Sequence, residues 1–304
     1  MDSGKQREGF VSRLGFILVS AGCAVGIGNV WRFPTVTGQN GGGVFVLFYL
    51  LFLVLMGVPV LTMDLAVGRA GHNSAVKAYK ALEPKGSKWH LHGWVCMIGC
   101  ALLMMYYTTV AGWMLDYFFK FLTGRFTGLA PDASAQVFSD ALANPGEQVL
   151  WMVVITVLGF LVCQKGLQGG LERITKYMMT LLMVLMVVLA IHSATLSGAA
   201  EGLKFYLVPD FSKITGTVIV GAMNQAFFTL SVGMGSMAIF GSYVGKERSL
   251  LGESVNVILL DTFVAIVAGL IMFPACFTYG LEVNAGPSLL FDTMASVFTH
   301  MAGG

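Results

Sequence analysis

Apolar residues gather along the chain into seven stretches, each of a length typical of a membrane-spanning helix. These stretches are residues 13–38, 43–68, 93–121, 148–164, 173–196, 215–241 and 251–280, and the fourth is the shortest. A helix needs about 20 mostly apolar residues to cross a bilayer. The segments between the stretches are polar, and backbone at membrane depth must satisfy its own hydrogen bonds. The pattern therefore predicts an all-α, polytopic membrane protein whose partner is the lipid bilayer.

Composition excludes a water-soluble protein. Hydrophobic residues make up 56% of the 304 residues and charged residues 11%, whereas about 25% of a soluble domain is charged. The Lys and Arg residues form no basic stripe with stacking aromatic residues, so no nucleic-acid partner is predicted.

The five cysteines all lie within apolar stretches: Cys23, Cys96, Cys100, Cys163 and Cys276. We therefore expect buried, reduced thiols and no disulfide framework. Cys96 and Cys100 are one helical turn apart, but no further soft ligand lies near them in the sequence, so a metal site is not predicted.

The distribution of Lys and Arg predicts the orientation of the chain, because cytoplasmic loops carry an excess of both. With the N-terminus inside, 13 of the 18 fall on the inner side: Lys5, Arg7, Arg13, Arg69, Lys77, Lys80, Lys85, Lys88, Lys165, Arg173, Lys176, Lys246 and Arg248. The other five are Arg32, Lys120, Arg125, Lys204 and Lys213. We expect a multi-pass protein of the plasma (inner) membrane with a cytoplasmic N-terminus. The first stretch lacks a small-residue cleavage site, so it is not interpreted as a signal peptide.

Two of the predicted spans contain a glycine cluster near the middle, and the two clusters resemble each other. Residues 24–29 read AVGIGN, and residues 231–236 read SVGMGS. A shared Val-Gly-x-Gly unit five spans apart is the pattern expected of inverted repeats with discontinuous helices. Because five is an odd number of spans, the second copy would lie upside down in the membrane. Close helix packing, for which Gly22 and Gly26 have the right spacing, is the alternative for a single cluster.

A break in a helix offers binding groups to ions of both signs. The unwound segment frees carbonyls for a cation, and the following half-helix offers N–H groups and a positive dipole to an anion. Such a site suits a zwitterion beside a sodium ion. No strand precedes either cluster, so a phosphate-binding loop is not predicted.

The repeats divide the chain into a cytoplasmic N-terminus (residues 1–12), a first five-span repeat (13–196) and the start of the inverted second repeat (197–304). The sequence ends in Gly-Gly just after an outside segment. An odd number of spans with such an end indicates truncation before an eighth span, and a natural seven-span protein is the alternative.

Asp261 and Asp64 are carboxylates in predicted spans, where a charge is costly unless it is paired or functional. Asp261 lies in the apolar run of residues 257–273, where Thr262 is the only other polar side chain and where no basic residue occurs. It could be an ion ligand, a proton carrier or the partner of a buried cation, and we favour sodium coordination. Asp64 is close in sequence to Arg69, which predicts a structural ion pair.

Tyr106 and Tyr107 are adjacent in the middle of the third span. One of the two is expected to pack against other helices, and the other to offer its hydroxyl to a carboxylate in the central cavity.

The first span closely resembles that of the neurotransmitter:sodium symporters, in their bacterial amino-acid branch. Residues 21–34 read AGCAVGIGNVWRFP and are followed by NGGG at 40–43. The similarity extends through Tyr106 and Tyr107, residues 225–231 (QAFFTLS) and the seventh span, up to the entrance of the family's eighth span. It implies the leucine-transporter fold, of which this chain would hold the first seven spans, with spans one and six discontinuous.

The resemblance also implies a function: a sodium-coupled symporter that imports a small hydrophobic or aromatic amino acid by alternating access, as bacterial leucine, tyrosine and multi-hydrophobic amino-acid transporters do. It assigns ten residues to substrate binding, namely Cys23, Ala24, Gly26, Gly28, Leu103, Tyr107, Val110, Phe228, Ser231 and Met234. Monoamine carriers have an Asp where this chain has Gly26, so Gly26 leaves room for a substrate carboxylate. Met234 is flexible enough to admit an aromatic ring.

Two sodium sites and a gate are implied in the same way. The first sodium site would use the Ala24 carbonyl, Asn29, Thr229 and Asp261, with Asn256 as the alternative ligand in the seventh span. The second would use the carbonyls of Gly22 and Val25 together with ligands from the eighth span. Arg32 resembles the extracellular gate residue, whose acidic partner lies in the family's tenth span. Without the later spans, we do not expect the chain to transport alone.

Chloride is not expected to be required. A gapless match with the animal members of the family puts Asp261 where they carry a ligand Asn. An ionised Asp would supply the negative charge that chloride provides in those members, with Tyr49 and Gln225 matching their chloride-site residues.

The rival interpretations are a channel and a receptor that binds an amino acid without coupled flux. A closed site at the membrane midplane with sodium ligands is expected of alternating access, not of an open pore. An enzyme is not predicted, because the chain has no His-Glu-x-x-His, no Gly-x-Ser-x-Gly and no paired catalytic carboxylates.

Overall fold

The computed structural model describes residues 12–126 and 131–281 together with residues 291 and 295, and this part of the chain is helical without a strand. Its α-helices are α1 (Arg13–Ala24), α2 (Phe33–Gln39), α3 (Gly43–Phe52), α4 (Val58–Gly71), α5 (Ala75–Leu82), α6 (His90–Leu122), α7 (Pro131–Ala143), α8 (Pro145–Gln164), α9 (Arg173–Ala194), α10 (Ala199–Leu207), α11 (Gly216–Thr229), α12 (Ser236–Gly241) and α13 (Leu250–Tyr279). Shorter π or 3₁₀ turns are η1 (Gly28–Arg32), η2 (Leu53–Gly57), η3 (Leu167–Glu172) and η4 (Phe211–Lys213).

Five continuous helical stretches are long and apolar enough to cross a membrane. They are Gly43–Gly71, His90–Leu122, Pro145–Gln164, Leu167–Ala194 and Leu250–Tyr279. They correspond to predicted spans two, three, four, five and seven. The fourth span, the shortest in the sequence, is the 20-residue helix α8.

The remaining two predicted spans are both broken. In the first, α1 and the stretch Gly28–Gln39 meet at 55°. In the sixth, α11 ends at Thr229 and α12 begins only at Ser236. Between them Ser231, Gly233 and Gly235 all have positive φ, which glycine adopts readily and other residues rarely. The two discontinuous helices are therefore confirmed, at the two Val-Gly-x-Gly units.

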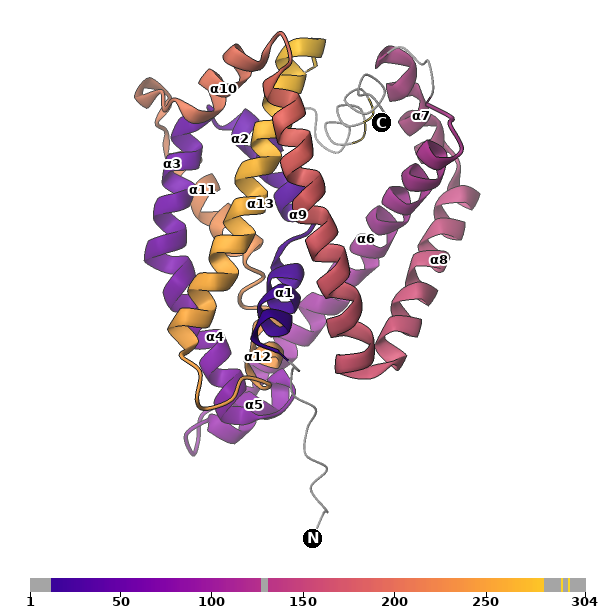
Figure 1. Ribbon diagram of the computed structural model, residues 1–304. Helices are drawn as coiled ribbons and strands as arrows, with labels where there is room; N and C mark the ends of the chain where they lie inside the picture. Colours follow the sequence, from indigo (N-terminus) through magenta and orange to yellow (C-terminus); the bar gives the residue numbers. More distant parts are fainter. Residues whose placement is uncertain (1–11, 127–130, 282–290, 292–294, 296–304) are drawn as a thin grey trace.

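Helix α13 forms the centre of the bundle. In the most apolar 18-residue window of α13, 67% of the window is buried, whereas none of the corresponding window of α8 is buried. It packs against α1, α4, α9 and α10, and Figure 1 shows it running along the molecule between α3 and α9. One core cluster joins its residues to those of α3, α4 and α11, and another joins them to those of α1 and α9. Both broken helices are thereby brought against the middle of α13.

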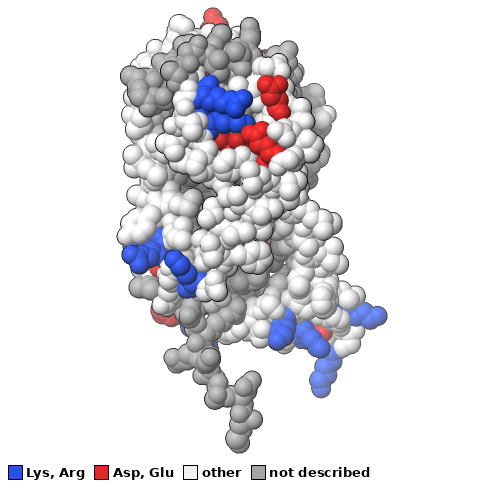
Figure 2. Space-filling model, turned by 90° about the vertical axis from the view of Figure 1, so that its right-hand side faces the viewer, with Lys and Arg blue, Asp and Glu red and all other residues white. Residues whose placement is uncertain are grey.

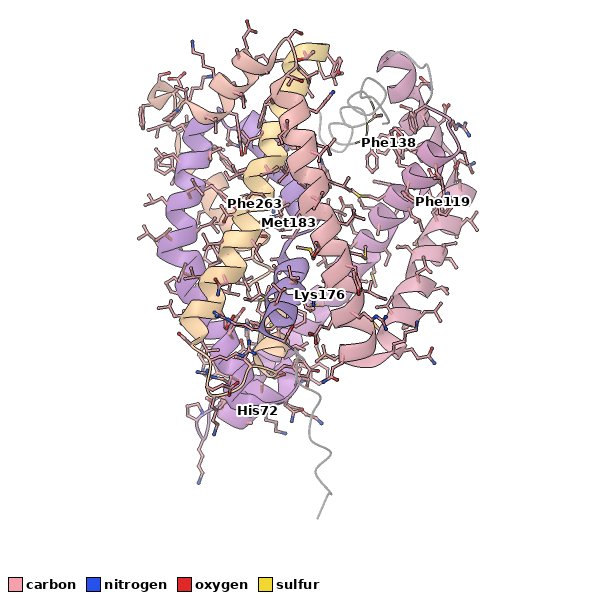
Figure 3. All side chains as sticks on the ribbon, viewed as in Figure 1. His72, Phe119, Phe138, Lys176, Met183 and Phe263 are labelled. Atoms are coloured by element: carbon pink, nitrogen blue, oxygen red, sulfur yellow. The ribbon has the colours of Figure 1, made fainter. Side chains whose placement is uncertain are left out.

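Helices α6 and α8 pack on each other at the side of the bundle (Figure 1). Phe119 of α6 stacks on Trp151 of α8, with ring centroids 5.0 Å apart, and Phe138 of α7 meets Trp113 edge to face at 5.8 Å (Figure 3). Lys120 bridges the same helices through ion pairs to carboxylates of both, Asp116 at 2.5 Å and Glu147 at 3.1 Å. Figure 2 shows a patch of mixed charge near one end of the molecule.

Most of the other basic side chains in Figure 2 lie toward the opposite end. At this end α6 begins with a local charge contact. Glu83 accepts hydrogen bonds from the backbone N–H of His90 at 3.0 Å and from its ring at 2.9 Å. These two bonds, the backbone one first, lower the pKa of the Glu83 carboxyl.

The cysteines are all free, as expected, but they are not all buried. Cys96 and Cys276 are buried, Cys23 and Cys100 are half-buried, and Cys163 is exposed. The prediction was wrong for Cys163 because the apolar stretch that holds it, α8, turns most of its surface away from the rest of the described chain.

Helices α4 and α12 approach each other so closely that glycine is needed at the contact. A Cβ on Gly68 would clash with the Ala238 carbonyl oxygen, and a Cβ on Gly241 would clash with that of Leu65. Both neighbours are backbone atoms, which cannot turn aside as a side chain can.

We expect Gly68→Ala to destabilise the full-length protein by about 1–3 kcal/mol, the usual cost of overpacking a core. Thermal unfolding in detergent measures this. Gly159→Ala is the matched control, since no atom lies within 4 Å of its added Cβ and alanine is the better helix former. Equal melting temperatures for the two variants would contradict the close contact of α4 with α12.

Candidate functional site

Three polar side chains from different helices meet in the middle of the bundle. Asp261 of α13 is fully buried, Thr229 is the last residue of α11, and Asn29 lies in η1. The Asn29 amide nitrogen donates to one carboxylate oxygen of Asp261 at 2.8 Å, and the Thr229 hydroxyl donates to the other at 2.9 Å. The same amide nitrogen is 3.1 Å from the Thr229 oxygen.

Both helix breaks position this cluster. Asn29 closes the first break, because its side-chain oxygen accepts the N–H of Gly26 at 3.2 Å. That contact turns the amide nitrogen toward α13, where it also lies 3.1 Å from the Asp261 backbone oxygen. Thr229 stands where α11 ends, at the second break. The Asn29 amide nitrogen therefore lies among three oxygens from two helices. They are the Thr229 hydroxyl oxygen of α11 and, from α13, one carboxylate oxygen and the backbone oxygen of Asp261.

The electrostatics of the cluster favour a cation. In the described part of the chain no Lys, Arg or His forms an ion pair with Asp261, so a buried basic side chain is not the partner found there. A carboxylate held only by neutral donors away from water costs several kcal/mol when ionised. The carboxylate and hydroxyl oxygens are ligands that hard cations take, while the Asn29 amide presents its nitrogen to them. The arrangement can hold either a cation such as sodium or a proton.

The two predicted chloride-site equivalents adjoin the cluster. Tyr49 of α3 is fully buried, and its hydroxyl lies next to those of Thr229 and Thr262 without a hydrogen bond to either. Gln225 of α11 donates to the carbonyl of Gly28 at 3.3 Å, while its side-chain oxygen has no partner among the described residues. Polar groups with spare hydrogen-bonding capacity thus adjoin the cluster.

Several of the predicted substrate residues come together around the first break. A Cβ on Gly26 would lie 2.9 Å from the hydroxyl of Tyr107, which reaches across from α6. Tyr106, its neighbour, is 49% exposed and points away. The Ser231 hydroxyl, from the second break, donates to the carbonyl of Cys23 at 3.4 Å. Ala24 ends α1 between these contacts and is buried.

Phe228 and Arg32 lie on the side of the first break that leads into α2. A Cβ on Gly28 would lie 3.0 Å from the Phe228 ring, and the Arg32 guanidinium stacks over that ring with its carbon 3.9 Å from the centroid. The predicted gate residue therefore covers an aromatic residue of the predicted pocket.

Other predicted residues are less constrained by their surroundings. Leu103 is half-buried and Val110 buried on α6, and Met234 is half-buried in the second break; their contact with a substrate stays a prediction.

Gly22 faces α9, where a Cβ would lie 2.9 Å from Thr175, so close packing accounts for this glycine. Val25 is the first residue beyond α1 and is extended. The roles of the Gly22 and Val25 carbonyls as sodium ligands stay predictions.

The predicted ion pair of Asp64 with Arg69 is wrong. Asp64 accepts the N–H of Gly233 in the second break at 3.0 Å, and Arg69 donates to the carbonyl of Arg248 at 2.8 Å. Residues three or four apart are neighbours on a helix, whereas residues five apart face different sides. Asp64 is thus a residue of the site that sequence reasoning missed. The signal was available, since an unwound segment at membrane depth must find acceptors for its N–H groups.

Comparison with known proteins shows which family of proteins the chain is similar to. Residues 7–130 and 132–301 match the family model described as the Sodium:neurotransmitter symporter family. The chain is 38% identical to an uncharacterized sodium-dependent transporter, YhdH, of Bacillus subtilis, over 97% of this chain and 65% of that protein. It is 26% identical to the bovine sodium- and chloride-dependent GABA transporter 2, over 90% of this chain and 51% of that protein.

The similarity extends to a solved structure, that of MhsT in complex with L-phenylalanine. The TM-score is 0.91 at 40% identity, over 97% of this chain and 67% of that one. The chain thus spans between about half and two thirds of the length of these relatives.

We expect Asp64 and Arg69 to act independently in a double-mutant cycle. Asp64→Ala should cost about 1–3 kcal/mol, because it removes the hydrogen bond between the Gly233 N–H and a charged acceptor. Adding Arg69→Ala should change the apparent stability by the same amount in either background, to within about 0.5 kcal/mol. Thermal unfolding of the full-length protein gives the four values. A coupling energy well above about 0.5 kcal/mol would mean that Asp64 and Arg69 do form an ion pair.

Proposed function

We propose that this chain, which belongs to the sodium:neurotransmitter symporter family, supplies the ion and substrate sites of a sodium-coupled transporter that imports a hydrophobic or aromatic amino acid by alternating access. The family match confirms the resemblance seen in the sequence. The match to the MhsT structure confirms the predicted leucine-transporter fold. Both findings assign the chain to transporters rather than enzymes. The observation that carries the proposal is the meeting of both helix breaks at the buried Asp261 carboxylate.

Sodium is proposed to bind at this carboxylate. Its ligands would be the Ala24 carbonyl, Asn29, Thr229 and Asp261, as the family resemblance implies. In the structure the Asn29 amide turns its nitrogen toward Asp261 and Thr229. Sodium would require the amide to present its oxygen instead, so that the ion replaces the N–H groups as the positive partner of the carboxylate. The second sodium site would include the carbonyls of Gly22 and Val25.

The substrate is proposed to bind at the first break. Gly26 keeps the space beside the Tyr107 hydroxyl free of a side chain, and that hydroxyl can donate to a substrate carboxylate. Phe228, Leu103, Val110 and Met234 would surround an apolar side chain. The related structure with L-phenylalanine supports this substrate class. Arg32, stacked on Phe228, would close the site from the outside.

The chain is proposed to need no chloride. Its relative GABA transporter 2 is named as chloride-dependent, whereas here the Asp261 carboxylate would supply the negative charge, beside Tyr49 and Gln225. The proposal places the protein in the plasma (inner) membrane with its N-terminus in the cytoplasm, in keeping with the distribution of Lys and Arg.

We expect the full-length protein in proteoliposomes to accumulate L-phenylalanine when an inward sodium gradient is imposed, and not when the gradient is absent. Thr229→Val removes the hydroxyl that is the proposed sodium ligand beside the buried carboxylate, a loss of about 1–3 kcal/mol, so uptake at low substrate should fall about tenfold or more. Thr229→Ser keeps the hydroxyl and is the control. Unitary current openings would favour a channel, and sodium-independent binding without flux would favour a receptor.

Replacing chloride by gluconate should leave uptake by the parent unchanged, because the carboxylate stays in the protein. In Asp261→Asn the charge is lost, and uptake should fall and be partly restored by chloride. Both measurements use the same proteoliposomes at a fixed sodium gradient. A several-fold loss of uptake by the parent in gluconate would overturn the proposed chloride independence.

A further inference from the structure

Three side chains from outside the second break take up backbone groups that the break leaves without helical partners. Asp64 of α4 accepts the N–H of Gly233 at 3.0 Å. The thiol of Cys96 donates to the carbonyl of the same residue, Gly233, at 3.1 Å, and the thiol of Cys100 donates to the carbonyl of Met234 at 3.3 Å. Both polar groups of Gly233 are therefore held by side chains of other helices.

The two thiols lie where α6 faces the broken helix. Cys96 and Cys100 are one turn apart and so share a face of α6. Cys96 is 3% exposed, whereas its neighbours Val95 and Met97 are exposed at 64% and 50%. The approach is close, because a Cβ on Gly235 would lie 3.3 Å from the Cβ of Cys96.

We propose that Cys96 and Cys100 are positioning residues for the substrate site. By holding the carbonyls of Gly233 and Met234, the thiols fix the path of the segment that carries Ser231 and Met234 toward the first break. The inference rests on the proposed function, since the site that they position is the proposed amino-acid site.

Thiols suit a contact that must both form and release. A thiol is a weak donor, and cysteine otherwise behaves as a small apolar residue. A buried hydroxyl that loses its partner incurs the cost of an unsatisfied polar group. When the segment moves away, the thiols of Cys96 and Cys100 therefore incur less of this cost than serines would. Serine at both positions should keep the segment in place but slow its release.

The test uses the full-length protein and four forms: the parent, C96A/C100A, C96S/C100S and the control C163A, whose cysteine is exposed on α8. Hydrogen–deuterium exchange of residues 230–236 reports the hold on the segment, and equilibrium L-phenylalanine binding in sodium reports the site. We expect the alanine pair to exchange about tenfold faster in this segment and to bind about tenfold more weakly. The serine pair should exchange no faster and bind no more weakly than the parent and show a lower kcat for uptake, and C163A should match the parent throughout.

Two results would overturn the inference: exchange in the alanine pair within about twofold of the parent, or a serine pair as defective as the alanine pair at an unchanged melting temperature. The second result would mean that the cysteines act by packing alone. Failure of the proposed function looks different, because the parent would then show no sodium-dependent L-phenylalanine binding. In that case the exchange rates of the alanine and serine pairs decide whether the thiols hold the segment.

Discussion

A carboxylate placed deep in an apolar bundle, with only neutral donors around it, is the constraint on which the rest of the arrangement depends. Asp261 is fully buried in α13, the most buried of the five continuous membrane-length stretches. Ionised, such a group needs a cation or several hydrogen bonds to stay where it is. The backbone of an unbroken helix offers neither, because its polar groups are already paired with one another. The two breaks, through Asn29 and Thr229, supply the two hydrogen bonds to the carboxylate.

The breaks themselves follow from glycine and from side chains that replace lost helical bonds. Gly233 and Gly235 adopt positive φ, and the freed groups of Gly233 are taken up by Asp64 and Cys96. At the first break the Asn29 side chain binds back to the N–H of Gly26. Asn29 therefore serves local structure and the central cluster at once. This dual role would couple ion binding at Asp261 to the conformation of the break, and hence to the amino-acid site beside it.

Much of this could be predicted from the sequence, because the signals are periodic or local. The apolar stretches predict the spans, the repeated Val-Gly-x-Gly unit predicts both breaks, and the isolation of Asp261 in its span marks the site. Which face of a helix meets which neighbour is not encoded so locally. For this reason the partner of Asp64 was missed, as were the exposure of Cys163 and the thiol bonds of Cys96 and Cys100. Each depends on the rotation of a helix against others far away in the sequence.

The central claim is that sodium binds at Asp261 and thereby completes the amino-acid site. Equilibrium binding of radiolabelled L-phenylalanine to the purified full-length protein, with and without sodium, tests it most directly in the parent and in Asp261→Ala. The account predicts binding that requires sodium in the parent and is lost in the variant, while the variant keeps its fold by circular dichroism. Equal binding by the parent with and without sodium would contradict it.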